Sequence, residues 1–127
     1  MSLPAGVPSQ MFVGGEWADG SAGTFEVLNP SDGSVLCAVP RAGVDDVQRA
    51  VGVAADAQRD WAATAPRERG EVLRRAFEAM LARKEDLAFL MSLEMGKSLT
   101  DARGEVSYAA EFFRWFGEEA VRIDGAL

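Results

Sequence analysis

Cys37 is the first candidate for chemistry, because it is the one cysteine of a 127-residue chain that has no histidine. A nucleophilic cysteine needs a neighbouring base or a cationic group that stabilises its thiolate. Neither adjoins Cys37 in the sequence. It shares an alternating pattern with Val35 and Val39, as a small apolar residue of a strand does. We interpret Cys37 as structural. The lack of histidine excludes Ser–His and Cys–His pairs and histidine metal sites from these residues.

Glu94 is the second candidate, and it lies in the last turn of a predicted helix. The helix dipole is negative at that end and disfavours a carboxylate there. Three partners would offset this effect: water, the side chain of Lys97, or a bound cation that also contacts backbone carbonyl groups. The residues alone leave these alternatives open and favour solvent or Lys97 over the cation.

A run of aromatic residues late in the chain is the third candidate. Aromatic residues at helical spacing belong to a packed core more often than to a pocket. Here they cover more than one face of a helix, which leaves apolar surface that a chain of this size does not cover by itself. The pattern indicates contact with missing residues or with another subunit. The residues are Tyr108, Phe112, Phe113, Trp115 and Phe116.

Short strands precede the helices that would position these side chains. Residues 1–10 predict an extended arm, since they contain two prolines and a glycine. Three short antiparallel strand elements follow. They are the hairpin 11–18 with Gly14-Gly15 at its turn, the strand 24–28, and the strand 34–39.

From Asp45 onward the apolar spacing becomes helical, and about four helices are expected. Asp45 with Gln48 predicts a capping box at the start of the first helix. Pro66 suits the first position of the second helix, which is expected to bend or restart near residues 83–84. Gly96 suits the residue just past a helix end.

Ser98 with Asp101 predicts a second capping box at the start of the final helix, and Gly125 predicts its end. The expected core face of this helix consists of Val106, Ala109, Phe113, Phe116 and Ala120. By itself the chain is therefore predicted to be α+β, with the strands before the helices.

Composition excludes several function classes. With 20 acidic and 13 basic residues the net charge is −7, which disfavours nucleic-acid binding. No apolar run approaches the roughly 18 residues of a membrane span, and no phosphate-binding glycine motif is present. The N-terminus does not have the pattern of a secretory signal, and a single cysteine suits a reducing compartment, so we expect a cytoplasmic location.

Three segments, in this order and spacing, resemble the N-terminal quarter of the aldehyde dehydrogenase family. They are FVGGEW at 12–17, TFEVLNPSDGSVLCAVP at 24–40, and LEMGK at 93–97 with GEVSYAAEFFRWFGEEAVRIDG at 104–125. The E-x-G-K sequence followed by a long aromatic helix is the most specific part. Softer signals such as RWFGEEA make the succinate-semialdehyde dehydrogenase branch the most similar.

The resemblance implies a doubly wound α/β enzyme that oxidises a small aldehyde to a carboxylic acid with NAD or NADP; succinate semialdehyde is a candidate substrate. In this family a cysteine thiolate attacks the aldehyde, a hydride passes to the nicotinamide, and a glutamate base activates the water that hydrolyses the thioester. The family's nucleophile, base and cofactor-binding residues fall beyond Leu127. We therefore assign no catalytic or cofactor-binding residue here and expect residues 1–127 alone to be inactive.

The resemblance also implies a place for this chain in a larger molecule. Residues 11–127 correspond to the N-terminal part of the cofactor-binding domain, and the family's members assemble as dimers or tetramers. In some members a monovalent cation is held by the acid at the position of Glu94 and by backbone carbonyls at the positions of Val27 and Leu28. The positions of Gly104 and Tyr108 line the substrate tunnel in related enzymes.

The alternative is a non-catalytic helical module that binds a protein partner through its aromatic helix. This alternative explains why no catalytic groups are found. It does not explain why the turn signals and the E-x-G-K sequence occur in the enzyme's order, so we favour the enzyme.

Overall fold

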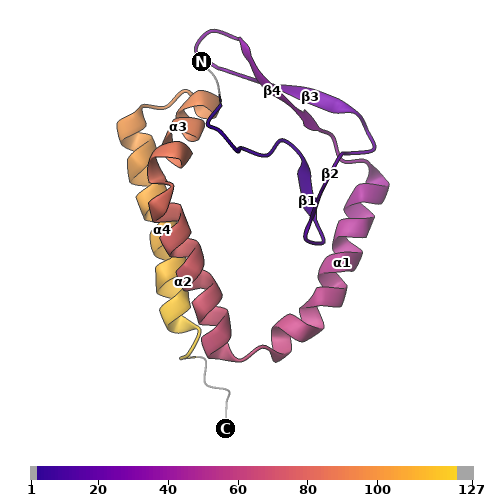
Figure 1. Cartoon of the computed structure of the whole chain (residues 1–127), viewed down its shortest axis with the longest axis vertical. Helices are drawn as coiled ribbons and strands as arrows, with labels where there is room; N and C mark the ends of the chain where they lie inside the picture. The colour runs from indigo at the N-terminus through magenta and orange to yellow at the C-terminus, as the bar shows by residue number, and fades with distance from the viewer. Residues whose placement is uncertain (1–2, 123–127) are drawn as a thin grey trace. The chain divides into compact units, whose positions relative to one another are not determined.

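The computed structural model describes residues 3–122 and shows four strands followed by four helices (Figure 1). The chain divides into two compact units, which are described separately. The first unit comprises Met1–Ala63 and Leu93–Gly96, and the second comprises Thr64–Ser92 and Lys97–Leu127. None of the four described helices has the length and apolar character of a membrane crossing.

The first strand pair is a short hairpin of β1 (Met11–Val13) and β2 (Glu16–Ala18). Gly14 and Gly15 form its turn with φ angles of +66° and +86°, which residues with a Cβ rarely adopt. The rings of Phe12 and Trp17 face each other across the pair at 4.9 Å. The hairpin is as predicted, but it forms a sheet of its own.

The second pair consists of β3 (Thr24–Leu28) and β4 (Val35–Pro40). Its pairing register shifts between Val27, which lies opposite Cys37, and Leu28, which lies opposite Val35. The described residues therefore form four strands in two antiparallel sheets of two, whereas the sequence predicted three strand elements in one set. The α+β class is confirmed.

The turn between β3 and β4 is held by Asn29, which is 5% exposed. Its side-chain oxygen accepts the N–H of Ser31 at 3.0 Å, and its own N–H donates to the carbonyl of Ser34 at 2.8 Å. Gly33 completes the turn with a φ of +72°. The first bond pairs the oxygen of a buried side chain, and together the two bonds fix where the strand pair reverses.

Helix α1 (Val44–Ala63) begins at a carboxylate, but not at the predicted one. One oxygen of Asp46 accepts three hydrogen bonds, from Gly43 N at 2.8 Å, Ser21 N at 2.8 Å and Ser21 Oγ at 2.7 Å. The predicted capping box of Asp45 and Gln48 is therefore wrong. The backbone of the β2–β3 loop supplies the partner instead, and this loop is 25 residues away in sequence.

The three later helices begin where the sequence indicates. Helix α2 (Pro66–Ala82) has Pro66 in its first turn, and α3 (Lys84–Met95) restarts directly after Arg83. Gly96 follows α3 with a φ of +72°.

Ser98 opens α4 (Leu99–Glu119), and its hydroxyl oxygen accepts the N–H of Asp101 at 3.1 Å. The predicted helix start at Ser98 is therefore confirmed, and the carboxylate of Asp101 accepts the Ser98 hydroxyl at 2.7 Å. The helix ends at Glu119, before the predicted end at Gly125, which lies outside the described residues.

Within the second unit, α2 and α4 pack side by side (Figure 1). Two glycines lie at this contact. A Cβ on Gly70 would lie 2.8 Å from the carbonyl oxygen of Gly117, and a Cβ on Gly117 would lie 3.3 Å from that of Gly70. A helix pair this close needs residues without side chains at the contact.

Small residues also form the buried core beside this contact. Ala88 of α3 packs with Ala102 and Val106 of α4, and Leu87 and Met91 cover the cluster. On α4 the buried stripe is Ala102, Val106 and Ala110. The predicted core face is therefore wrong at its C-terminal end, because Phe113 is 37% and Phe116 is 55% exposed. The small residues are buried, and the large aromatic residues stay partly exposed, although Phe112, Phe113 and Phe116 share a hollow with Leu73 of α2.

Candidate functional site

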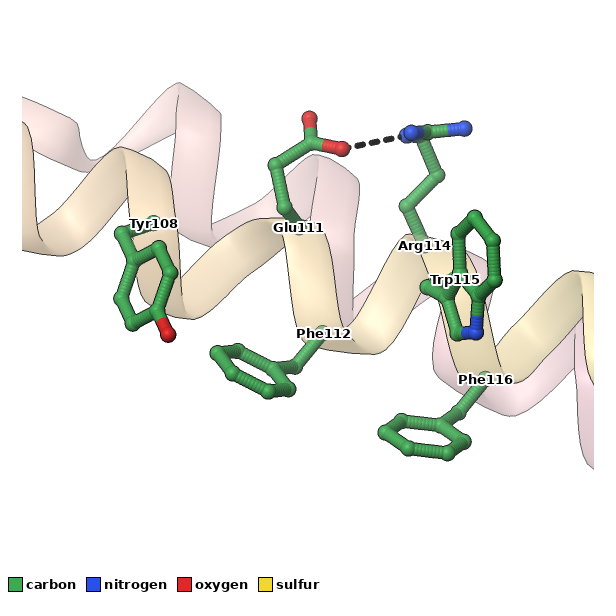
Figure 2. A pocket seen from close by; sticks show the side chains of 6 residues that line it. All are labelled: Tyr108, Glu111, Phe112, Arg114, Trp115 and Phe116. Atoms are coloured by element: carbon green, nitrogen blue, oxygen red, sulfur yellow. Dashed lines mark hydrogen bonds and ion pairs between the residues drawn. The ribbon is translucent and has the colours of Figure 1, made fainter.

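The most prominent surface feature of the second unit is a row of aromatic side chains along α4. We call it the aromatic face and define it as Tyr108, Phe112, Trp115 and Phe116, whose exposed fractions run from 48% to 67%. With Glu111 and Arg114 they line an open, largely apolar hollow of about 350 Å³ (Figure 2). The predicted exposure of aromatic surface on this helix is confirmed.

Three rings of this face follow one another at one ring per helical turn. The centroids of Tyr108 and Phe112 are 5.0 Å apart with the rings at 88°, an edge-to-face contact. Phe112 and Phe116 are 6.5 Å apart and nearly parallel, at 17°. Figure 2 shows the three rings on one side of α4, and the Glu111–Arg114 ion pair on the opposite side.

The charged side of the same helix is held by Arg114, which bonds Glu111 at 2.6 Å and Glu118 at 2.9 Å. The hydrogen bond with Glu111 raises the pKa of the Arg114 guanidinium above its ordinary value. This ladder was not among the predicted features, although its spacing of three and four residues is the sequence signal for one. These ion pairs hold the charged side chains of Glu111 and Arg114 at the edge of the apolar hollow.

Gly104 lies one turn before Tyr108, on the same side of α4. A Cβ placed on Gly104 would have nothing within 4 Å, so no described neighbour requires a glycine there. The adjacent residues are anchored by ion pairs. Arg103 binds both carboxylate oxygens of Glu85 at 2.8 to 3.0 Å, and Lys97 pairs with Glu105. These ion pairs hold the first turns of α4 in place on either side of Gly104, which has no side chain.

Glu94 lies at the C-terminal end of α3, within the first unit, and is exposed. Lys97, which the sequence offered as its partner, pairs with Glu105 instead. Within residues 3–122 Glu94 makes no ion pair or side-chain hydrogen bond. Solvent and a cation remain as the two ways to offset its charge against the helix dipole.

The same end of α3 lies against the turn that follows β3. A Cβ on Gly96 would lie 3.0 Å from Cγ of Pro30, two residues after Leu28. The register shift between Val27 and Leu28 interrupts the regular hydrogen-bond ladder at this point. Val27, Leu28 and Glu94 thus belong to the same unit. No group of three or more acidic, His or Cys side chains suited to a metal occurs within residues 3–122.

Cys37 lies in β4 opposite Val27, half-buried and with a free thiol. It belongs to a strand pair and not to either candidate site, which agrees with its structural interpretation. The described residues therefore contain a candidate cation site at the end of α3 and an apolar hollow along α4. They contain no nucleophile–base pair.

Known proteins share this fold and much of this sequence. The sequence model of the "Aldehyde dehydrogenase family" matches residues 17–127, and the chain belongs to that family. The chain is 45% identical over 117 residues to a glutarate-semialdehyde dehydrogenase of Pseudomonas putida KT2440, a match that covers 91% of this chain and 24% of that protein. It is 44% identical over 117 residues to the succinate-semialdehyde dehydrogenase [NADP(+)] of Escherichia coli K12, with the same coverage.

The similarity extends to solved structures. The crystal structure of an aldehyde dehydrogenase from Brucella melitensis biovar abortus 2308 superposes with a TM-score of 0.94 at 41% identity. That match covers 99% of this chain and 27% of the other. The chain spans about a quarter of the length of the relatives it matches.

Proposed function

We propose that the protein to which these residues belong oxidises a small semialdehyde, such as succinate or glutarate semialdehyde, to the carboxylic acid. The observation that supports this proposal is the family match over residues 17–127 together with relatives named for those two substrates. NAD or NADP would accept the hydride when bound. The alternative of a non-catalytic interaction module is disfavoured, because the family match extends over nearly all of the chain.

In this proposal residues 1–127 contribute support and not chemistry. Residues 11–127 would be the N-terminal part of the cofactor-binding domain, and residues 1–10 an extended arm. Within the described residues the one thiol, Cys37, lies in a strand pair opposite Val27. No glycine-rich turn that cradles phosphates opens any of the four described helices. The residues present do not fit a dinucleotide, so no catalytic step is assigned to them.

We propose that Val27, Leu28 and Glu94 hold a monovalent cation, with the two strand residues acting through their backbone carbonyls. The end of α3 provides a negative dipole, and Glu94 has no protein partner among residues 3–122. The contact of Gly96 with Pro30 brings this end to the turn after Leu28. Oxygen ligands of this kind suit alkali cations, which bind through charge and carbonyl dipoles.

The cation proposal is tested by comparing K⁺ and Na⁺ with a large organic cation as the salt. Small cations are expected to raise the melting temperature of the protein, and Glu94→Gln is expected to remove the difference. Glu118→Gln is the matched control, since Glu118 is an exposed glutamate paired with Arg114. An equal response to all three cations would contradict the proposal.

We propose that Gly104 and Tyr108 form part of the wall along which the aldehyde enters. The proposal is supported by Gly104, which leaves open space beside α4, and by Tyr108, whose ring is exposed one turn later. Replacing Tyr108 by alanine is expected to change the selectivity between short and bulky aldehydes more than it changes the turnover of the best substrate. An unchanged selectivity would contradict this role.

We also propose a cytoplasmic homo-oligomer. The exposed aromatic face and the apolar residues of α1 leave surface that further protein is expected to cover. Analytical ultracentrifugation of residues 1–127 is expected to show association that rises with concentration. A monomer at every concentration would contradict this expectation.

The activity itself is tested on the complete gene product. It is expected to reduce NAD or NADP with succinate or glutarate semialdehyde, and residues 1–127 alone are expected not to do so. A complete protein that binds neither cofactor would overturn the proposed function. Turnover by residues 1–127 alone would contradict the expectation that these residues carry no catalytic group.

A further inference from the structure

We propose that Phe112 is a positioning residue that fixes the orientation of the Tyr108 ring, and through it the width of the aldehyde path. This inference rests on the proposed role of Tyr108 as a specificity residue. Phe112 is not expected to touch the aldehyde. It acts through the edge-to-face contact between the two rings.

The contacts of Tyr108 are the first argument. Its side chain is 67% exposed, so packing around it leaves its ring free to take more than one rotamer. Among residues 3–122 its one ring contact is with Phe112, and its hydroxyl makes no hydrogen bond. Among residues 3–122 the ring contact that orients Tyr108 is therefore the one with Phe112.

The second argument is that Phe112 is itself held in place. Its ring lies nearly parallel to that of Phe116, one turn further along α4. Figure 2 shows Phe112 between the other two rings on the same side of the helix. Because Phe112 has the ring of Phe116 on one side, its own ring is restrained, and it can in turn restrain the ring of Tyr108 on the other side.

The third argument is where the row of rings ends. Tyr108 is its N-terminal member, and the next position on that side, Gly104, has no side chain. A small rotation of the Tyr108 ring moves its hydroxyl relative to the space beside Gly104. In this proposal the angle of the Tyr108 ring sets how much of the space beside Gly104 is open to an aldehyde chain.

The test uses Phe112→Leu, which keeps apolar bulk and removes the ring. An edge-to-face pair contributes enough to change the ratio of kcat/KM for a short and a bulky aldehyde by about two- to tenfold. Phe112→Tyr keeps an aromatic edge and is expected to restore the ratio. In a Tyr108→Ala background, Phe112→Leu is expected to have no further effect on the ratio, which separates positioning from general loss of structure.

A spectroscopic measurement tests the contact independently of activity. In the complete protein with isotope-labelled tyrosine, the signal that disappears in Tyr108→Phe identifies Tyr108. Phe112→Leu is expected to shift this signal, because the ring current of Phe112 acts on it. Phe113→Leu is the matched control, because Phe113 is on the same helix and has no ring contact with Tyr108.

The outcomes distinguish the two proposals. An unshifted Tyr108 signal in Phe112→Leu would overturn the positioning role whatever the kinetics show. An unchanged selectivity in Tyr108→Ala, with the signal still shifted by Phe112→Leu, would overturn the role of Tyr108 in the aldehyde path and with it the functional part of this inference.

Discussion

Where α2 packs against α4, a Cβ on Gly70 would lie 2.8 Å from the carbonyl oxygen of Gly117. That oxygen belongs to the backbone, so it cannot move aside as a flexible side chain can. Glycine inside a helix costs about 0.5–1 kcal/mol relative to alanine. The close approach of the two helices is what offsets this cost at Gly70.

Gly70→Ala is expected to destabilise the protein. The added methyl group forces α2 and α4 apart, an overpacking that costs about 1–3 kcal/mol and exceeds the gain in helix propensity. The free energy of unfolding from urea titration measures the effect.

Gly52→Ala is the matched control, because Gly52 is also inside a helix and a Cβ added there would have nothing within 4 Å. It is expected to stabilise the protein by about 0.5–1 kcal/mol. Equal changes for the two variants would contradict the account of the α2–α4 contact.

Asp46 is expected to make the protein sensitive to acid. Hydrogen bonds from the backbone of Ser21, the backbone of Gly43 and the Ser21 hydroxyl lower the pKa of Asp46 from 3.8 to about 2. Because the folded-state pKa is depressed, the carboxylate contributes its stability fully above pH 3.8. That contribution is lost as the pH falls toward 2, where the folded protein also protonates the group.

The Asp46 prediction is checked by measuring melting temperature between pH 6 and pH 2. Asp46→Asn is expected to lower stability at pH 6 and to flatten the loss between pH 4 and pH 2. Asp45→Asn is the control, since Asp45 is also in the first turn of α1 and the three bonds go to Asp46. Loss of the acid step in Asp45→Asn would argue against this assignment.

Gly96 and Gly33 allow a backbone cost and a packing cost to be separated. Both have a φ of +72°, so alanine at either position is expected to cost about 1–2 kcal/mol in backbone strain. A Cβ on Gly33 meets nothing within 4 Å, whereas one on Gly96 lies 3.0 Å from Pro30. Thermal unfolding is therefore expected to show the larger loss for Gly96→Ala. Equal losses of stability would mean that the ring of Pro30 moves away from the added methyl group at no cost in free energy.

Ala102 is expected to tolerate no larger side chain. It is fully buried against Ala88 and Val106, and Ala102→Leu is expected to destabilise by about 1–3 kcal/mol through overpacking. Ala79→Leu, at an exposed position of α2, is expected to change the free energy of unfolding by less than about 0.5 kcal/mol. A neutral Ala102→Leu would show that the alanine core is loosely packed.

Local signals in the sequence were sufficient to predict the ends of most elements. Pro66, Gly96 and the pair Ser98–Asp101 lie where predicted, because each acts on backbone groups within four residues. The start of α1 was predicted wrongly for the opposite reason. The carboxylate at the start of α1 is that of Asp46, because Ser21 donates hydrogen bonds to it. No local pattern shows which of two adjacent aspartates reaches a loop 25 residues away.

In the candidate site, too, the features set by local sequence were predicted and those set by distant residues were not. The aromatic spacing predicts uncovered apolar surface on the final helix, and the structure confirms it, with Tyr108 and Phe112 exposed and in contact on one side of α4. Spacing does not show which stripe of the helix finds a partner, so Phe116 was placed in the core although it is 55% exposed. The cation role of Glu94 stays a prediction, since its support in the sequence is a helix end and a resemblance.

The short segment Leu93–Gly96 belongs to the first unit although the residues on both sides of it belong to the second. Its contact with Pro30 joins positions more than sixty residues apart in the chain. During synthesis on the ribosome the first unit therefore cannot complete its packing when Ala63 emerges, and it must wait for Gly96. All of α2 and all of α3 are made in the interval, so we expect the two units to mature together and not in the order in which they are translated.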